Sequence, residues 1–201
     1  MNGGPALRPW CLSALSCVCF LLSGCVDIPA DIDIPLTIDT DVTGIDTGSS
    51  SPGAYIAQLE THAQEKLNAL RLAAGVASLP VTRSLGDVAR AHSLAMLTGG
   101  FFSHEDLQGR SPQDRLAAAR ISYDSADELI GFANTQAGVS ASDVDAILEE
   151  LASQRRTEER AILMSPTWTE MGAGIALSDS QRVLFLTIDL VEYPPRVIGV
   201  D

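Results

Sequence analysis

Few side chains in this 201-residue sequence could do chemistry, and the three histidines are the most informative of them. His104 follows two aromatic residues and precedes Glu105 and Asp106. His92 lies on the apolar side of a helical pattern. It is interpreted either as a buried histidine satisfied by hydrogen bonds or as part of a cleft floor beneath His104. His62 lies beside the apolar positions of another helical pattern, which predicts a surface or boundary position.

No arrangement of residues typical of a nucleophilic enzyme is present. The sequence has neither a Gly-x-Ser-x-Gly motif nor a phosphate-binding loop. All four cysteines lie at or before Cys25, so the rest of the chain offers no thiol. Ser103 precedes His104 directly, but sequence neighbours rarely point at each other, so the pair does not indicate a catalytic triad. An enzyme is therefore the weaker functional interpretation.

Acidic and basic residues cluster late in the chain. Acidic pairs occupy 149–150 and 158–159, with arginines at 155–156 and 160. By residue type alone, such carboxylates could serve as a general acid and base. Runs of this kind more often form the solvated face of a helix with ion pairs four residues apart, and we predict that arrangement here. This prediction does not extend to Glu159.

The first 25 residues carry the pattern of an export signal. Residues 1–9 contain one charge, Arg8, and an apolar or small run follows over 10–22. A helix over that run spans about 20 Å, short of the roughly 30 Å of bilayer hydrocarbon, so it predicts a signal peptide over 1–24. Positions 22–25 (Leu-Ser-Gly-Cys) are similar to the bacterial lipobox, in which the cysteine is lipidated after cleavage. A plain secretory signal is the alternative.

Lipidation of Cys25 would place the protein in the cell envelope, outside the cytoplasm. Acyl chains anchor a protein to a membrane because each buried CH₂ contributes about 0.8 kcal/mol. The next residue is Val26 and not Asp. By resemblance to enterobacterial sorting, this favours the outer membrane or the cell surface.

Residues 25–53 are predicted to comprise the lipidated cysteine and an acidic flexible tether. The segment 26–53 holds six Asp and no Lys or Arg, together with several prolines and a Gly/Ser cluster. Like charges repel, which favours an extended, solvated spacer. Apolar and acidic residues alternate over 31–34, however, and Leu36 and Ile38 continue the alternation. This period of two is the pattern of an edge strand, which is the alternative interpretation.

A folded domain is predicted over 54–193, followed by a tail over 194–201. Helices are predicted over 54–74, over 84–98, from 111, and from 142 through Arg155 and Arg156 towards Leu163. A hairpin is predicted from strands over 172–177 and 182–191 around a turn at 178–181. Helices packed against a small antiparallel sheet make an α+β domain.

Composition narrows the choice of partners. The formal charge of −13 argues against nucleic acid, because phosphate binding needs clustered Lys and Arg.

Hydrophobic residues make up 46% of the chain, which suffices for a real core. Since no cysteine follows Cys25, that core must hold the mature domain without an internal disulfide.

Short motifs follow one another in a fixed order between residues 60 and 190. They are Leu67-Asn68-Ala69-Leu70-Arg71, Ala91-His92-Ser93 with Met96, Gly100-Phe101-Phe102-Ser103-His104, Gly109-Arg110-Ser111-Pro112 with Asp114-Arg115, and Thr169-Glu170-Met171-Gly172. Together they resemble the CAP superfamily of cysteine-rich secretory proteins, antigen 5 and plant pathogenesis-related proteins, and most of all its bacterial, SCP-like branch. The resemblance implies an α-β-α sandwich whose cleft holds a His and Glu cluster, which in some members binds a divalent cation.

The resemblance also assigns residues to that cleft. His104 matches the first family histidine, and Glu128 matches the Glu of the family's Gly-Glu-Asn, here Asp127-Glu128-Leu129. Glu159 stands where the second histidine belongs. The implied metal ligands are therefore His104, Glu128 and Glu159. They would suit Zn²⁺ or, because a carboxylate replaces an imidazole, the harder Ca²⁺ or Mg²⁺. The alternative is that His104 stabilises its loop by hydrogen bonds and no metal binds.

Two functions follow from these observations. The first is a non-enzymatic, lipid-anchored CAP-domain module that binds a wall polymer, a lipid or a partner protein through a degenerate His/Glu cleft. The second is a divalent-metal-dependent hydrolase of the cell envelope, in which the cation polarises a carbonyl or activates water.

Overall fold

The computed structural model describes residues 52–193, which lie in one of the two compact units of the chain, Asp33–Asp201. The predictions for the signal peptide, Cys25, the tether with its alternating segment, and the tail fall outside the described residues. Within 52–193, no helix combines the length and the apolar character needed to cross a bilayer.

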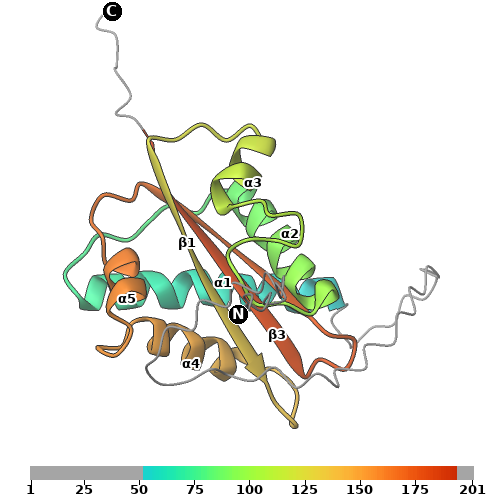
Figure 1. The fold of residues 1–201 in the computed structure, drawn as a ribbon. Coiled ribbons are helices and arrows are strands. Elements are labelled where there is room, and N and C mark those ends of the chain that lie inside the picture. The colour runs from blue at the N-terminus through green and yellow to red at the C-terminus, as the bar shows by residue number, and fades with distance from the viewer. Residues whose placement is uncertain (1–51, 194–201) are drawn as a thin grey trace, which may run out of the picture. The chain divides into compact units, whose positions relative to one another are not determined.

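The described residues form an α+β fold, as predicted (Figure 1). In chain order, the elements are α1 (Pro52–Ala73), α2 (Arg83–Gly99), α3 (Pro112–Ala118), β1 (Ser125–Asn134), α4 (Ala141–Leu151), α5 (Thr157–Leu163), β2 (Glu170–Leu177) and β3 (Val183–Glu192). The strands make one antiparallel sheet in the order β1-β3-β2, so β3 is central and β1 and β2 are its edges.

The two faces of the sheet carry separate layers of helices. Alternate side chains of a strand point to opposite faces, and β3 follows this rule closely. One set packs into the main core with residues of α1, α4 and α5: Leu184, Leu186, Ile188 and Leu190. The other set faces the α2 and α3 side: Phe185, Thr187, Asp189 and Val191. The result is the predicted α-β-α sandwich.

Two glycines of β2 let α2 lie directly on the strand. A Cβ atom on Gly172 would come within 2.2 Å of the backbone nitrogen of Gly86. On Gly174 it would come within 1.9 Å of the backbone nitrogen of Arg90. Since neither separation is physically possible, only glycine permits this approach. The close packing fixes the height of α2, and therefore of His92, above the sheet.

Local signals explain where the helices begin and end. The predicted start near Ser111 is confirmed: its side chain accepts from the backbone nitrogen of Asp114, and the Asp114 carboxylate accepts from the Ser111 backbone. Gly100 ends α2 with a left-handed conformation at φ 65°, which glycine adopts without a steric penalty. The hairpin of β2 and β3 is also confirmed.

The helix predicted to run from 142 to Leu163 is wrong, because the chain makes two helices there. The first of these helices, α4, begins earlier than predicted, after Ser140, and ends at Leu151. A separate α5 starts at Thr157, and the Arg160 guanidinium donates to the carbonyl of Ala152 at 2.5 Å across the break. The break lets Leu163 reach the main core, in which it is fully buried.

Candidate functional site

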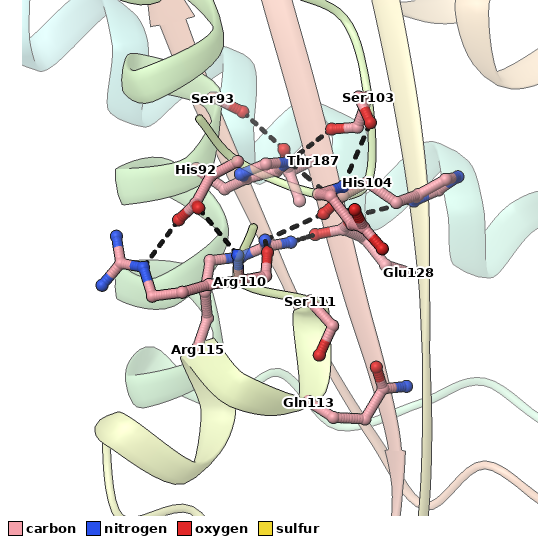
Figure 2. A network of polar contacts seen from close by, with 12 residues as sticks. His92, Ser93, Ser103, His104, Arg110, Ser111, Gln113, Arg115, Glu128 and Thr187 are labelled. Carbon is pink, nitrogen blue, oxygen red and sulfur yellow. Dashed lines mark hydrogen bonds and ion pairs between the residues drawn. The ribbon is translucent and has the colours of Figure 1, made fainter. Parts of the chain in front are cut away.

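A buried carboxylate, Glu128, lies at the centre of the candidate site (Figure 2). Its residue is only 2% exposed, and both carboxylate oxygens are engaged. Oε1 accepts from Nδ1 of His104 at 2.8 Å, and Oε2 accepts from Nη2 of Arg115 at 2.5 Å. Strand β1 aims Glu128 towards the side of the sheet covered by α2 and α3, so residues far apart in sequence meet at one carboxylate.

His104 lies on the loop between α2 and α3, with its side chain 54% exposed. An ionised carboxylate only accepts hydrogen bonds, so Nδ1 of the ring carries the proton shared with Glu128. In the neutral ring, this leaves Nε2 as an acceptor. The arrangement therefore provides one oriented imidazole nitrogen for a ligand, positioned by a carboxylate behind it.

Arg115 was not predicted from the sequence as a site residue, although it lies in one of the family-like motifs. Its residue is 8% exposed, and its guanidinium spans the gap between α3 and β1. Nη1 donates to the carbonyls of His104 at 2.9 Å and Arg110 at 3.0 Å. One side chain thus neutralises Glu128 and holds two points of the loop that carries His104.

His92 lies beneath this loop on α2 and is 1% exposed. Its Nε2 donates to the carbonyl of Ser103 at 2.9 Å and lies 3.9 Å from Oε1 of Glu128. Burial lowers the pKa of His92, outweighing the nearby charge of Glu128, so the ring is neutral at pH 7. The histidine supports the loop from inside the protein. A direct role for it in a cleft stays a prediction.

Asp189 is a second buried acid that sequence reasoning missed. It lies opposite Glu128 in the register of β1 and β3, and it is 1% exposed. Burial, reinforced by the charge of Glu128, raises the pKa of Asp189 well above its usual value. A signal was available, because Asp189 is the one acidic residue in the apolar run from Val183 to Val191.

A groove of about 440 Å³ opens beside His104. It is lined by the loop after α2, by β1 and by the start of α5: Phe102, Ser103, His104, Glu105, Leu129, Ile130, Arg156 and Glu159. Glu159 thus shares the groove with His104, and its carboxylate accepts from Nη1 of Arg156 at 2.8 Å. The two residues are three positions apart, at the start of α5.

The three predicted metal ligands belong to one region of the molecule, but they do not form a metal cage as they are placed. Glu128 is shared between His104 and Arg115, and Glu159 is paired with Arg156. Within the described part of the chain, no group of three His, Cys, Asp or Glu side chains converges as a metal site would require. The ligand set therefore stays a prediction.

Comparison with known proteins identifies the fold. Residues 64–190 match the model of the CAP, cysteine-rich secretory protein, family. No curated protein sequence matches the chain at a significant level.

Three solved bacterial structures are similar to this one. An extracellular protein of Bacillus anthracis that contains an SCP domain is 21% identical with a TM-score of 0.58; the match covers 73% of this chain and 45% of that one. An outer surface protein of Borrelia burgdorferi is 12% identical with a TM-score of 0.57, covering 68% and 94%. A cysteine-rich secretory protein of Staphylococcus aureus is 16% identical with a TM-score of 0.54, covering 73% and 42%. This chain thus corresponds to less than half of the Bacillus and Staphylococcus proteins.

Proposed function

Because this chain belongs to the CAP, cysteine-rich secretory protein, family, we propose that it is a lipid-anchored, extracytoplasmic module that binds an envelope ligand in the groove beside His104. The lipobox-like sequence at Cys25 supports the anchor. The extracellular and outer surface proteins among the similar structures are compatible with a place outside the cytoplasm.

The observation that carries the binding role is the way Glu128 holds the imidazole of His104. Both oxygens of Glu128 are held by His104 and Arg115, in a buried position. This network keeps the imidazole in one orientation, which reduces the entropy lost when a ligand binds.

The lining of the groove suits an amphipathic ligand. Phe102 and Ile130 provide apolar contact area, and His104, Glu105 and Arg156 provide hydrogen-bonding groups. A wall polymer, a lipid headgroup or a protein segment combines these properties. The mixed lining therefore supports an envelope component as the ligand class.

The first prediction tests the groove with a matched pair of histidine variants. The full chain, purified in detergent, is incubated with peptidoglycan fragments, with vesicles of bacterial lipids and with envelope extract. His104→Ala should lower retention on the binding material about tenfold, because it removes a hydrogen bond assisted by the Glu128 network. His62→Ala is the control, since its ring pairs with Asp145, a residue of α4. Equal retention of both variants would show that the groove does not bind this material.

A metal titration of the same protein distinguishes the hydrolase alternative from the binding role. Elemental analysis is combined with thermal unfolding in Zn²⁺, Ca²⁺ and Mg²⁺, because an ion that binds the native state must raise its stability. Bound metal, with a thermal shift that Glu159→Gln abolishes, would overturn the binding-only proposal and favour hydrolysis.

A further inference from the structure

The groove beside His104 lies over one edge of the sheet. Leu129 and Ile130 both line it, although neighbouring side chains of a strand point to opposite faces of the sheet. The other lining residues come from the loop after α2, on one face, and from the start of α5, on the other. A ligand in the groove therefore lies against the backbone of β1 at the sheet edge.

The backbone of β1 has unpaired groups at this edge. Hydrogen-bonded positions alternate along each strand of an antiparallel pair. Thr135 donates its backbone N–H to Arg182 at 2.9 Å, so in the register of β1 the odd-numbered residues bond to β3. The even-numbered residues turn outward, and within residues 52–193 the backbone groups of Ile130 and Phe132 have no partner. Such an edge is a template for a further strand.

Acidic side chains outnumber basic ones around the groove. Glu105 and Glu159 both line it, together with one arginine, Arg156. That arginine is already paired with Glu159 at 2.8 Å and with Glu150 at 3.8 Å. The carboxylate of Glu105 is exposed and has no partner in the described part of the chain. The groove therefore favours a cation and disfavours an anion.

The groove also presents acceptors and an aromatic surface. Because Nδ1 of His104 donates to Glu128, Nε2 is an acceptor in the neutral ring. The carboxylate of the next residue, Glu105, adds further acceptors. Phe102 is 40% exposed and provides an aromatic face for a cation or an alkyl chain. A lysine side chain matches both features, since its ammonium only donates and its stem is apolar.

We propose that the ligand of this groove is an extended peptide segment with a lysine side chain, which adds a strand to β1 at Ile130 and Phe132. The peptide backbone pairs with the unpaired groups of β1. The ammonium lies beside His104 and Glu105. This inference rests on the proposed function and deepens it, because it selects a basic protein segment over a lipid or a wall polymer.

Fluorescence anisotropy of short labelled peptides tests the proposal with the full chain in a non-ionic detergent. A peptide of alternating valine and lysine should bind. The same peptide with glutamate in place of lysine should bind at least about tenfold more weakly, because the groove repels its carboxylates. A lysine peptide methylated on its backbone nitrogens should also bind about tenfold more weakly, since it cannot donate to the carbonyls of β1.

A matched pair of protein variants tests whether the groove supplies the charge. The chain has a formal charge of −13, so a basic peptide is also attracted to other parts of it. Glu105→Gln/Glu159→Gln should weaken binding of the lysine peptide about fivefold. The control, Glu65→Gln/Asp179→Asn, makes the same change in charge at two exposed residues outside the groove. It should bind the peptide like the unmodified protein.

Hydrogen exchange of single backbone amides locates the bound peptide. The lysine peptide should slow exchange at Ile130 and Phe132 about tenfold relative to Leu129 and Gly131, which already bond to β3. An absence of this relative slowing, equal binding of the lysine and glutamate peptides, or no peptide binding would each overturn the proposal. If lipid vesicles or wall fragments are retained through His104 while no peptide binds, this inference fails and the proposed function stands.

Discussion

At the scale of single residues, the site depends on how buried charges are compensated. Glu128 has two donors, His104 and Arg115, which hold both of its oxygens. Asp189 lies opposite it without an equivalent set of donors, and its Oδ2 has no hydrogen-bond partner among the described residues. One acid is therefore held by charged and polar partners, whereas burial raises the pKa of the other.

This difference predicts how stability depends on pH. The folded-state pKa of Asp189 is raised above its unfolded value, so its contribution is fully present below the unfolded pKa of about 4. The contribution is lost as pH rises through the raised folded pKa. In urea unfolding from pH 4 upwards, Asp189→Asn should lack this loss and become more stable relative to the unmodified protein. Asp179→Asn, in the exposed turn, is the control and should follow the unmodified protein throughout. Parallel curves for all three proteins would contradict the assignment.

At the scale of elements, the packing of α2 on β2 determines the height of His92 above the sheet. No side-chain layer separates the helix from Gly172 and Gly174. A methyl group at either position must push the helix away or bend the strand, and overpacking of this kind usually costs about 1–3 kcal/mol.

Gly174→Ala is therefore expected to lower the free energy of unfolding by about 3 kcal/mol or more, since the new Cβ would meet helix backbone and not a flexible side chain. Gly53→Ala provides the control, because a Cβ there meets nothing within 4 Å in the helix α1. Chemical denaturation of both variants measures the difference. A cost for Gly174→Ala no larger than that for Gly53→Ala would show that α2 is not held so closely.

Sequence patterns predicted most elements, and the exceptions have physical causes. The hairpin and the start of α3 depend on local signals such as β-branched runs and capping residues. Strand β1 was not predicted, because Ser125–Asn134 contains Asp, Glu, Gly and Asn, which are depleted in strands. It is a strand because pairing with β3 outweighs its own propensity.

The site was less predictable than the fold. The resemblance identified His104 and Glu128, and the structure shows their hydrogen bond. Arg115 and Asp189 meet Glu128 from α3 and from β3, and contacts of such large sequence separation leave no periodic trace. Without the resemblance, Glu128 itself would have passed as a polar residue of a loop.

At the scale of the whole molecule, the lipid anchor proposed at Cys25 would decide where the groove acts. Cys25→Ser should move the protein from the membrane fraction to the soluble fraction, because the acyl chains supply the membrane affinity. Cys19→Ser, within the predicted signal peptide, should leave the protein in the membrane fraction. Fractionation with detection of the attached lipid measures both. Membrane retention of the Cys25 variant would contradict the lipobox prediction.

The guanidinium of Arg115 fixes the two ends of the short stretch from His104 to Arg110. Between them, Glu105, Leu107 and Gln108 are exposed. These exposed residues can therefore be substituted without disturbing the imidazole of His104. Relatives that keep the arginine could acquire new ligands through changes at these positions alone, so recognition could diverge while the framework stays the same.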